Sequence, residues 1–290
     1  MVDLHEAAVE ASAELVRQRG GDACVVQADV TKSGDVQNYV KATLDAHGAI
    51  DCFFNNAGIE GKVMPMQDYD EADFDAVIAV NLKGVFLGMR HVLPVMLKQR
   101  HGAIVNTSST AGLFGGPGIA PYVASKHAVL GLTKVASADV ARLRVRVNAV
   151  CPGLVETRMM RSLEAQINPA HPVAVHDAYS GSIPTGRYAT PEEVANVVMY
   201  LCSDLANDIT GTHIVIDGAA RPVPAERCGA SNNSSAIPTL VFLIAPAAAW
   251  PCRRKIEMSA GVQSRDDTPG GGEDGRGREI IFVLRSSPCI

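Results

Sequence analysis

The sequence predicts an α/β fold in which helices cover both faces of a doubly wound parallel sheet. Short runs rich in β-branched residues alternate along the chain with longer segments of helical periodicity. The short runs are apolar at nearly every position, as in strands that are buried on both faces. Polar or glycine-containing turns follow most of these runs directly, and ligands of such folds bind at the carboxyl ends of the strands.

The order of the elements follows from this periodicity. The expected helices cover residues 4–19, 33–47, 71–100, 122–142 and 191–202. The expected strands cover residues 23–28, 50–55, 103–107, 145–150 and 213–216. Residues 20–21 and Gly48 are expected to end the first two helices, while Ser33 and Thr190 should cap the second and the last. Pro94 should kink the long helix.

Composition excludes several classes of protein. Of the 290 residues, 47% are hydrophobic and 20% are charged, which excludes a wholly disordered, collagen-like or coiled-coil chain. The net charge of −5 argues against a nucleic-acid partner. The longest apolar stretch, residues 237–250, is too short and too interrupted by proline to cross a membrane, and the N-terminus does not resemble a signal peptide. The seven cysteines form no Cys-x-x-Cys pair, so we expect reduced thiols and a cytoplasmic location.

The composition changes after Gly218. Residues 1–218 are expected to form one folded domain, whereas residues 219–290 are rich in Pro, Gly, Ser and Arg and are expected to be a disordered, low-complexity tail. Two interpretations of this tail compete: a functional disordered segment, or sequence translated from an altered splice product or reading frame. We favour the second, because both ends of the chain depart from the family pattern described below.

Tyr122 and Lys126 share one face of an expected helix because they are four residues apart. Taken alone, the pair would equally suit an exposed helix surface. A tyrosine with a pKa near 10 is a poor acid or base at neutral pH, and a nearby ammonium lowers that pKa by favouring the phenolate. Ser109 follows an expected strand and could hydrogen-bond the carbonyl oxygen that Tyr122 protonates. With Asn81 in the long helix, these residues predict acid–base catalysis of hydride transfer between a carbinol and a cofactor.

These residues and two further motifs resemble the short-chain dehydrogenase/reductase family. Residues 55–58 are similar to its Asn-Asn-Ala-Gly motif, and residues 151–157, which read CPGLVET, are similar to its Pro-Gly-x-Val-x-Thr segment. Asn81 matches the family's helical asparagine, and Ser109, Tyr122 and Lys126 match its catalytic triad in order and spacing. The resemblance covers residues 1–218 and implies a Rossmann-like fold.

The resemblance implies a role for each of these residues. Tyr122 would be the acid/base, and Lys126 would lower its pKa and bind the nicotinamide ribose. Ser109 would orient the carbonyl group, and Asn81 would hold a water that relays protons from Lys126. The residues implied to bind the cofactor are Asp3, Asp29, Val30, Asn56, Ala57, Gly58, Tyr122, Lys126, Pro152, Gly153, Val155 and Thr157. No metal is expected, since the histidines are not paired at ligand spacing.

The expected cofactor is NAD, with NADP as the alternative. Asp3 aligns with the end of the family's second strand, where an acidic residue holds the ribose hydroxyls and repels a 2′-phosphate. Asp3 would equally suit the N-cap or first turn of the helix that follows it. The chain lacks the family's first strand, glycine-rich turn and first helix, so we expect it to bind dinucleotide far more weakly than full-length relatives.

The resemblance implies an NAD(P)-dependent alcohol dehydrogenase or ketone reductase that acts on a small secondary alcohol or ketone. Residues 56–62 and 168–172 are similar to bacterial reductases of cyclic ketones, and residues 158–190 are expected to form the substrate lid. One alternative is a 3-oxoacyl-carrier-protein reductase, which the lack of an obvious basic patch in the lid disfavours. Another is a non-catalytic form that only oligomerises with full-length partners. A homodimer or homotetramer is implied, paired through the helices at 71–100 and 122–142.

Overall fold

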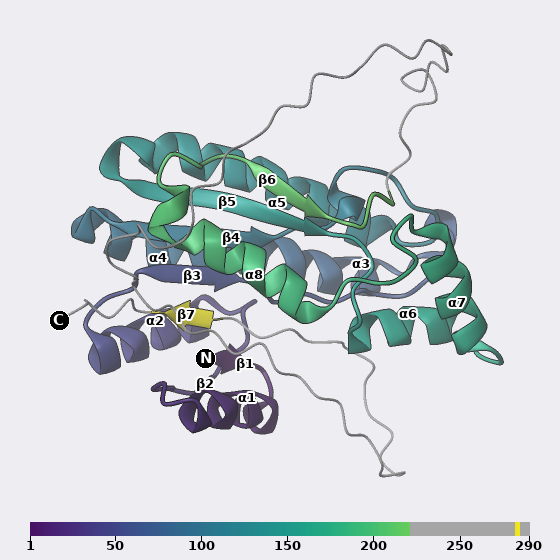
Figure 1. The fold of residues 1–290 in the computed structure, drawn as a ribbon, viewed down its shortest axis with the longest axis horizontal. Coiled ribbons are helices and arrows are strands. Elements are labelled where there is room, and N and C mark those ends of the chain that lie inside the picture. The colour runs from purple at the N-terminus through teal and green to yellow at the C-terminus, as the bar shows by residue number, and fades with distance from the viewer. Residues whose placement is uncertain (221–281, 285–290) are drawn as a thin grey trace, which may run out of the picture.

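The computed structural model of the chain describes residues 1–220 and 282–284. Its main sheet has the strand order β6-β5-β4-β3-β7 (Figure 1). The members are β3 (Cys52–Asn55), β4 (Gly102–Thr107), β5 (Val145–Pro152), β6 (His213–Ile216) and β7 (Phe282–Leu284). Strands β3 to β6 are parallel, as the sequence predicts. Strand β7 is antiparallel to β3 and places Phe282 opposite Phe54 at the carboxyl end of β3.

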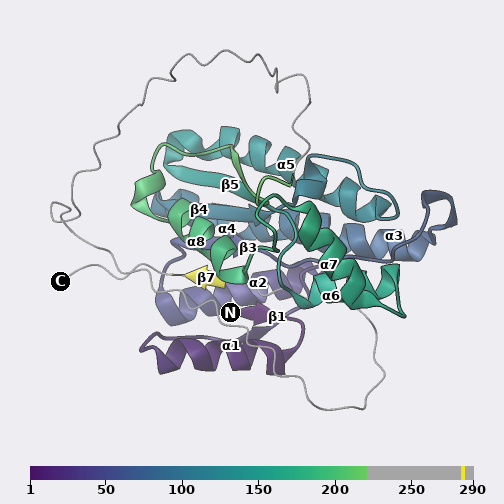
Figure 2. The same ribbon diagram turned by 45° about the vertical axis from the view of Figure 1, so that its right-hand side comes forward.

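A second, two-stranded parallel sheet joins β1 (Val2–Asp3) to β2 (Val26–Gln27). The expected strand over residues 23–28 is therefore reduced to two paired residues. Helix α1 (Glu6–Gln18) connects β1 to β2 and lies beside them at the bottom of Figures 1 and 2. In both views β7 lies between β3 and this pair of strands.

Helices cover both faces of the main sheet because its strands are apolar on both sides. Phe53 packs with α2 (Ser33–His47) and α4 (Val85–Gln99), whereas the next residue, Phe54, packs on the opposite face with α8 (Pro191–Cys202). Helix α5 (Ala120–Val140) joins α2 and α4 on the first face. Alternate residues of a strand point to opposite faces, so the continuous apolar run correctly predicts a sheet buried on both sides.

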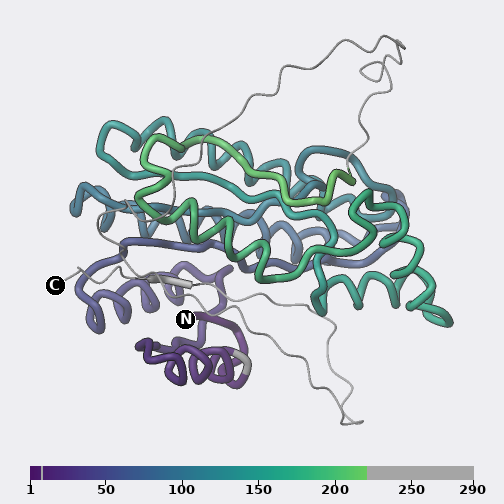
Figure 3. The backbone as a smooth tube through the Cα atoms, viewed as in Figure 1, coloured from purple at the N-terminus to yellow at the C-terminus, as the bar shows by residue number. Residues whose placement is uncertain are grey.

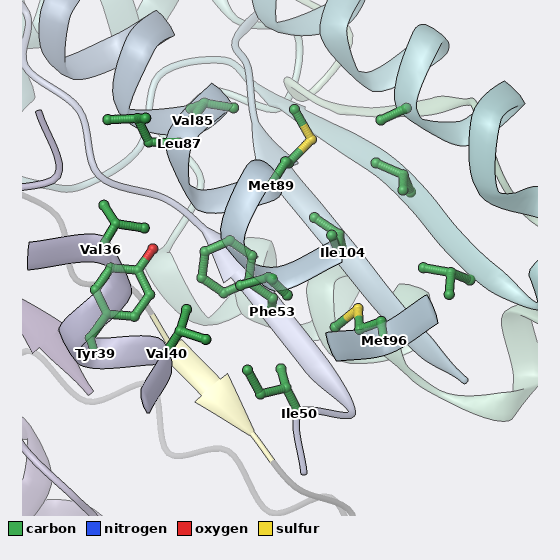
Figure 4. Packing of buried hydrophobic residues seen from close by; sticks show 14 of the residues in the cluster. Val36, Tyr39, Val40, Ile50, Phe53, Val85, Leu87, Met89, Met96 and Ile104 are labelled. Carbon is green, nitrogen blue, oxygen red and sulfur yellow. The ribbon is translucent and has the colours of Figure 1, made fainter. Parts of the chain in front are cut away.

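The largest part of the core lies under α2 and α4. Tyr39 of α2 stacks on Phe53 of β3 with ring centroids 6.3 Å apart (Figure 4). Met96 of α4 and Ile104 of β4 are fully buried beside them. This packing fixes α4 against the sheet, and α4 continues directly from the segment that carries Asn81.

The helix ends follow the sequence in part. Gly48 ends α2 in a left-handed conformation at φ 76°, and Thr190 caps α8 in a capping box with Glu193. The predicted cap at Ser33 is wrong. Lys32 occupies the N-cap position, and the Ser33 hydroxyl lies 2.9 Å from His91 Nε2 of α4 instead.

The long helical pattern over residues 71–100 is one run with an irregular centre. It consists of α3 (Glu71–Ile78), the π-helical segment η2 (Ala79–Gly84) and α4. Pro94 lies inside α4, where the sequence predicts a kink, and a π-helical irregularity that the sequence did not predict lies around Asn81. By length and composition alone the run could cross a membrane, which is weak evidence because core helices of globular proteins have the same character.

The expected lid forms two helices between β5 and α8, namely α6 (Arg158–Ile167) and α7 (Pro172–Ser182). The tube in Figure 3 shows the chain leaving the sheet for these helices and returning to it through α8. Short 3₁₀ turns complete the described elements: η1 (Met66–Asp68), η3 (Thr110–Gly112), η4 (Ala141–Leu143) and η5 (Asp204–Ala206). Of residues 219–290 only 219–220 and β7 are described, so the expectation of a disordered tail otherwise lies outside the described residues.

Candidate active site

The predicted site residues lie mainly at the carboxyl ends of β3, β4 and β5. These ends meet at one rim because the strands are parallel and in register, with Asn55 opposite Asn106 and Thr107 opposite Val150. Helices α6 and α7 lie at the same rim, on the right of Figure 1. The sheet therefore gathers segments that are up to about a hundred residues apart in the sequence.

Tyr122 and Lys126 lie one turn apart on α5, and the Lys126 ammonium is 5.5 Å from the centroid of the Tyr122 ring. Lys126 is buried, and its ammonium donates a hydrogen bond of 2.9 Å to the carbonyl oxygen of Thr107 at the end of β4. The hydroxyl of Ser108 donates to the backbone carbonyl of Lys126 at 2.8 Å. The end of β4 thus holds both the side chain and the backbone of the lysine.

Asn81 is fully buried in the π-helical segment η2. Its side chain accepts a hydrogen bond from the Ile59 amide at 2.8 Å and donates to the Ile59 carbonyl oxygen at 2.9 Å. It also donates to the Ser125 hydroxyl, which in turn donates to the carbonyl oxygen of Tyr122. Asn81 therefore ties the loop after β3 to the turn of α5 that carries Tyr122. π-Helical turns are frequent at functional sites.

Ser109 lies directly after β4 and caps η3 by accepting a hydrogen bond from the Ala111 amide. Its hydroxyl also donates to the carbonyl oxygen of Pro152 at 3.3 Å. The η3 turn packs against α5, so Ser109 lies between the tyrosine-bearing helix and the end of β5. The four predicted catalytic residues are thus gathered at one rim of the sheet.

The Asn-Asn-Ala-Gly segment follows β3. Asn56 accepts a hydrogen bond from the Thr107 hydroxyl at 2.7 Å, and Ala57 packs against the main core. Gly58 lies so close to the site that an added Cβ would be 3.4 Å from Asn81 Oδ1 and 3.5 Å from Lys126 Nζ. The loop therefore brings its backbone next to the lysine without a side chain in between.

The segment after β5 holds the other predicted cofactor residues. The Gly153 amide donates to the Ile216 carbonyl oxygen, and a Cβ at Gly153 would lie 2.9 Å from Asp217 Cβ. Val155 forms a bridge with Ala189, and Thr157 caps α6 by accepting from the Met160 amide. These contacts fix the segment between the sheet and the lid.

Asp3 is the last residue of β1, and Asp29 and Val30 follow β2 within three residues. Asp3 is buried and accepts a hydrogen bond from the His5 amide at 2.8 Å, whereas the N-cap of α1 is His5. Asp29 accepts from the amide and the hydroxyl of Thr31. Partial burial opposes ionisation of Asp29, but these bonds and the neighbouring Lys32 lower its pKa.

The sequence pattern gives no signal for two groups of residues at this rim. The first links the lid helices. His176 Nε2 of α7 lies 3.0 Å from Glu156 Oε1, its ring packs on Tyr188 at 4.5 Å, and the Tyr188 hydroxyl donates to Glu164 of α6. The hydrogen bond with Glu156, with smaller contributions from Asp177 and Glu164, raises the pKa of His176. Because His176 and Glu156 are 20 residues apart, no short motif in the sequence predicts that they pair.

The second is Glu60, which is 2% exposed and follows directly on the Gly58-Ile59 loop. Neither carboxylate oxygen has a hydrogen-bond partner among the described residues. The only available sequence signal was a charged residue within an otherwise apolar and glycine-containing stretch. Such residues are usually exposed, so the pattern could not identify this one as buried.

A nicotinamide dinucleotide fits this arrangement in part. Because Gly58 has no side chain, the loop leaves room for a ligand next to Lys126. The nicotinamide half of that ligand would be held by Tyr122, Lys126 and the segment Pro152–Thr157. Asp3, Asp29 and Val30 lie at strand ends where the adenosine half would bind. The described residues contain no glycine-rich turn of the type that cradles the pyrophosphate.

Comparison with known proteins gives a consistent result. A family profile described as enoyl-(acyl carrier protein) reductase matches residues 1–219. Levodione reductase of Leifsonia aquatica is 40% identical over 220 residues, which cover 75% of this chain and 82% of that protein. A 3-oxoacyl-[acyl-carrier-protein] reductase of Thermotoga maritima is 42% identical over 190 residues, covering 66% and 74% respectively. Cyclohexanol dehydrogenase of an Acinetobacter species is 40% identical over 214 residues, covering 74% and 80%.

The solved structures that resemble this chain include one of the same relatives, levodione reductase. The crystal structure of levodione reductase superposes with a TM-score of 0.74 at 38% identity, covering 75% of this chain and 85% of that one. NAD⁺-bound xylitol dehydrogenase gives a TM-score of 0.71 at 35% identity, covering 75% and 86%. ElxO with NADP bound gives 0.68 at 29% identity, covering 76% and 86%.

Proposed function

The chain belongs to the short-chain dehydrogenase/reductase family of oxidoreductases, and from that premise we propose that it interconverts a small secondary alcohol and its ketone with NAD(P)(H). The observation that carries the proposal is the Lys126 ammonium 5.5 Å from the centre of the Tyr122 ring, at the carboxyl rim of a parallel sheet. A bound nicotinamide would supply or accept the hydride.

The residues of this chain would manage the proton. Tyr122 is the proposed acid/base, since the buried cation beside it favours the phenolate over the phenol. Lys126 would also bind the nicotinamide ribose, and Ser109 would hydrogen-bond the substrate oxygen at which Tyr122 exchanges its proton. Asn81, fixed by three side-chain hydrogen bonds, would hold the water that relays protons from Lys126.

We propose NAD as the preferred cofactor. A buried carboxylate at Asp3 supports this choice because it would accept bonds from ribose hydroxyls and repel a 2′-phosphate. The structural neighbours include one with NAD⁺ and one with NADP bound, so both dinucleotides belong in the assay.

The proposed substrates are small and preferably cyclic. Two relatives at 40% identity are named for levodione and cyclohexanol. A second candidate function, reduction of a 3-oxoacyl thioester on a carrier protein, is supported by the relative from Thermotoga maritima at 42% identity. An acidic carrier needs a basic surface, and the lid offers only a small one: Arg158 and Arg161 lie on α6, while its third arginine, Arg187, is paired with Glu193.

We also propose assembly as a homodimer or homotetramer in the cytoplasm. Phe86 of α4 and Val135 of α5 are exposed apolar side chains on the two helices that the family resemblance implies for pairing. The same helices would serve a non-catalytic form that associates with full-length partners. Sedimentation velocity of the purified chain that is used in the turnover assay below measures its oligomeric state.

The test is turnover by the purified chain with NAD(H) and NADP(H), using cyclohexanol, cyclic ketones and a 3-oxoacyl thioester. Tyr122→Phe removes the acid/base hydroxyl, so we expect kcat to fall at least about 100-fold with little change in the melting temperature. Ser137→Ala is the matched control on the same helix, since its hydroxyl donates to the Lys134 carbonyl oxygen, fifteen residues beyond Tyr122. Turnover that survives Tyr122→Phe would contradict the assignment, and complete inactivity of the assembled wild type would favour the non-catalytic alternative.

A further inference from the structure

Glu60 is a buried carboxyl group without a hydrogen-bond partner among residues 1–220 and 282–284. The residue is 2% exposed, and both carboxylate oxygens are enclosed. Burying such a group unpaired costs free energy, and most buried polar atoms in native proteins do have partners. Glu164, the other buried glutamate among the described residues, follows that rule and accepts a hydrogen bond of 2.9 Å from Tyr188. Glu60 therefore needs an explanation that packing does not supply.

The position of Glu60 in the chain places it next to the proposed catalytic residues. Its neighbour Ile59 exchanges two hydrogen bonds with the Asn81 side chain. The residue before that, Gly58, would bring a Cβ to 3.5 Å from Lys126 Nζ. Glu60 is thus within two residues of backbone that contacts both Asn81 and Lys126.

The lid helix α6 contacts the loop that follows Glu60. Gln166 of α6 donates to the Gly61 carbonyl oxygen at 3.3 Å and accepts from the Val63 amide at 2.9 Å. Gly61 has φ 75° and fits against α3, where a Cβ would come within 2.7 Å of Val77. Glu60 therefore lies on a loop held between the catalytic network and a lid helix, which is where substrate binds in a lidded site.

We infer that Glu60 binds a second hydroxyl group of the substrate, so that the preferred substrates are diols or hydroxyketones rather than simple alcohols. Two carboxylate oxygens accept hydrogen bonds, and an alcohol hydroxyl donates one. A monohydric alcohol has only its reacting hydroxyl, which Tyr122 and Ser109 would engage. A second hydroxyl of a bound substrate would supply the partner that Glu60 lacks among the described residues. This inference rests on the proposed function, because it assigns a substrate class to the same site.

The experiment compares cyclohexanol with cyclohexane-1,2-, 1,3- and 1,4-diol as substrates of the wild-type chain, Glu60→Leu and Glu60→Gln. A hydrogen bond that satisfies this buried carboxyl group supports a preference of about tenfold in kcat/KM for at least one diol. We expect Glu60→Leu to reduce that ratio to about one, mainly through KM, and Glu60→Gln to give an intermediate value. Glu164→Gln is the matched control, since it changes a buried glutamate that already has a partner and should leave the ratio unchanged.

A second readout does not need turnover. Glu60→Leu removes an unpaired buried carboxyl, so the melting temperature of the free protein should rise by a few degrees, whereas Glu164→Gln should lower it. Added diol should raise the melting temperature of the wild type more than that of Glu60→Leu.

The outcomes separate the two claims. Turnover by the wild type with a diol ratio that Glu60→Leu leaves unchanged would overturn the inference and leave the proposed function standing. Absence of turnover would refute the proposed function, and the diol-dependent melting shift would then decide the role of Glu60. A fall in melting temperature for Glu60→Leu, with no diol effect in the wild type, would make Glu60 a structural residue and overturn the inference.

Discussion

A lysine that is 2% exposed must exchange its hydration for partners that the fold supplies. Lys126 receives one at its ammonium from the Thr107 carbonyl oxygen, while its own carbonyl oxygen accepts from Ser108. Both hydrogen-bond partners, Thr107 and Ser108, lie at the carboxyl end of β4. The position of the ammonium relative to Tyr122 therefore depends on how closely α5 approaches β4. That approach requires Gly112, because a Cβ there would lie 2.3 Å from Ser108 Oγ and 2.8 Å from the Lys126 carbonyl oxygen.

Gly112→Ala should therefore shift the position of Lys126 although the lysine itself is unchanged. We expect a loss of about 1–3 kcal/mol in the free energy of unfolding, measured in urea, because the added methyl separates Ser108 from α5. Gly131→Ala is the matched control, since Gly131 lies within α5 with nothing near its missing Cβ and should gain about 0.5–1 kcal/mol. Equal effects of the two substitutions would show that the close approach at Gly112 has no energetic importance.

At the scale of residues, the sequence predicted those that belong to a pattern. Tyr122 and Lys126 share a helical spacing, and Ser109 follows a strand, so periodicity placed them near one another. The partners of Lys126 could not be predicted, because the Thr107 carbonyl is a backbone group that every residue has. Glu60 was missed because burial of a charged residue depends on tertiary packing, which here brings α3 and α6 against the adjacent Gly61.

The irregular element at the site is the π-helical segment η2. It lies between two regular helices and contains the buried Asn81, whose side chain reaches the Ile59 backbone. A π turn adds a residue to the helical ring and so rotates the helix beyond it. Neither Pro94 nor any capping residue predicted this irregularity. Asn81 within it pairs with the Ile59 backbone, a tertiary contact that a local sequence pattern does not encode.

The lid helices carry a pH-sensitive contact. The hydrogen bond with Glu156 raises the pKa of His176 above 6.5, so folding favours the protonated imidazole. Its contribution to stability is therefore complete below about pH 6.5 and is lost as the pH rises through the higher folded-state pKa. We expect the difference in melting temperature between the wild type and His176→Gln to be larger at pH 6 than at pH 8.5.

His171→Gln is the control for this measurement. His171 lies at the N-cap of α7 and has no carboxylate contact comparable to that of His176 among the described residues. Its melting difference gives the effect of removing a lid histidine that lacks this ion pair. A pH-independent difference for His176→Gln would mean that the ring acts only by packing on Tyr188.

At the scale of the molecule, the alternation of strands and helices correctly predicted that β3 to β6 are parallel and that helices cover both faces of the sheet. It did not predict β7, since its three paired residues lie in a tail whose composition suggested disorder. It also overestimated β2, because a β-branched run predicts strand character and not the length over which a neighbour pairs with it.

Strand β7 is open to a direct test. Deleting residues 280–290 leaves β3 paired only with β4, so we expect the β3 amides that pair with β7 to exchange hydrogen at least about tenfold faster. The β5 amides at Val147 and Ala149 are the internal control, since β4 and β6 flank that strand. Unchanged exchange at β3 would show that β7 does not pair there in solution.

One close contact also connects the two ends of the proposed dinucleotide site. Gly84 ends the segment that holds Asn81, and a Cβ on it would lie 2.9 Å from Val30 Cγ2, beside Asp29. The helix backbone therefore rests directly on the loop that would receive the adenosine. Asn81 lies three residues before Gly84 in the same segment, so the amide proposed for the proton relay belongs to the helical turn against which the loop proposed for the adenosine packs.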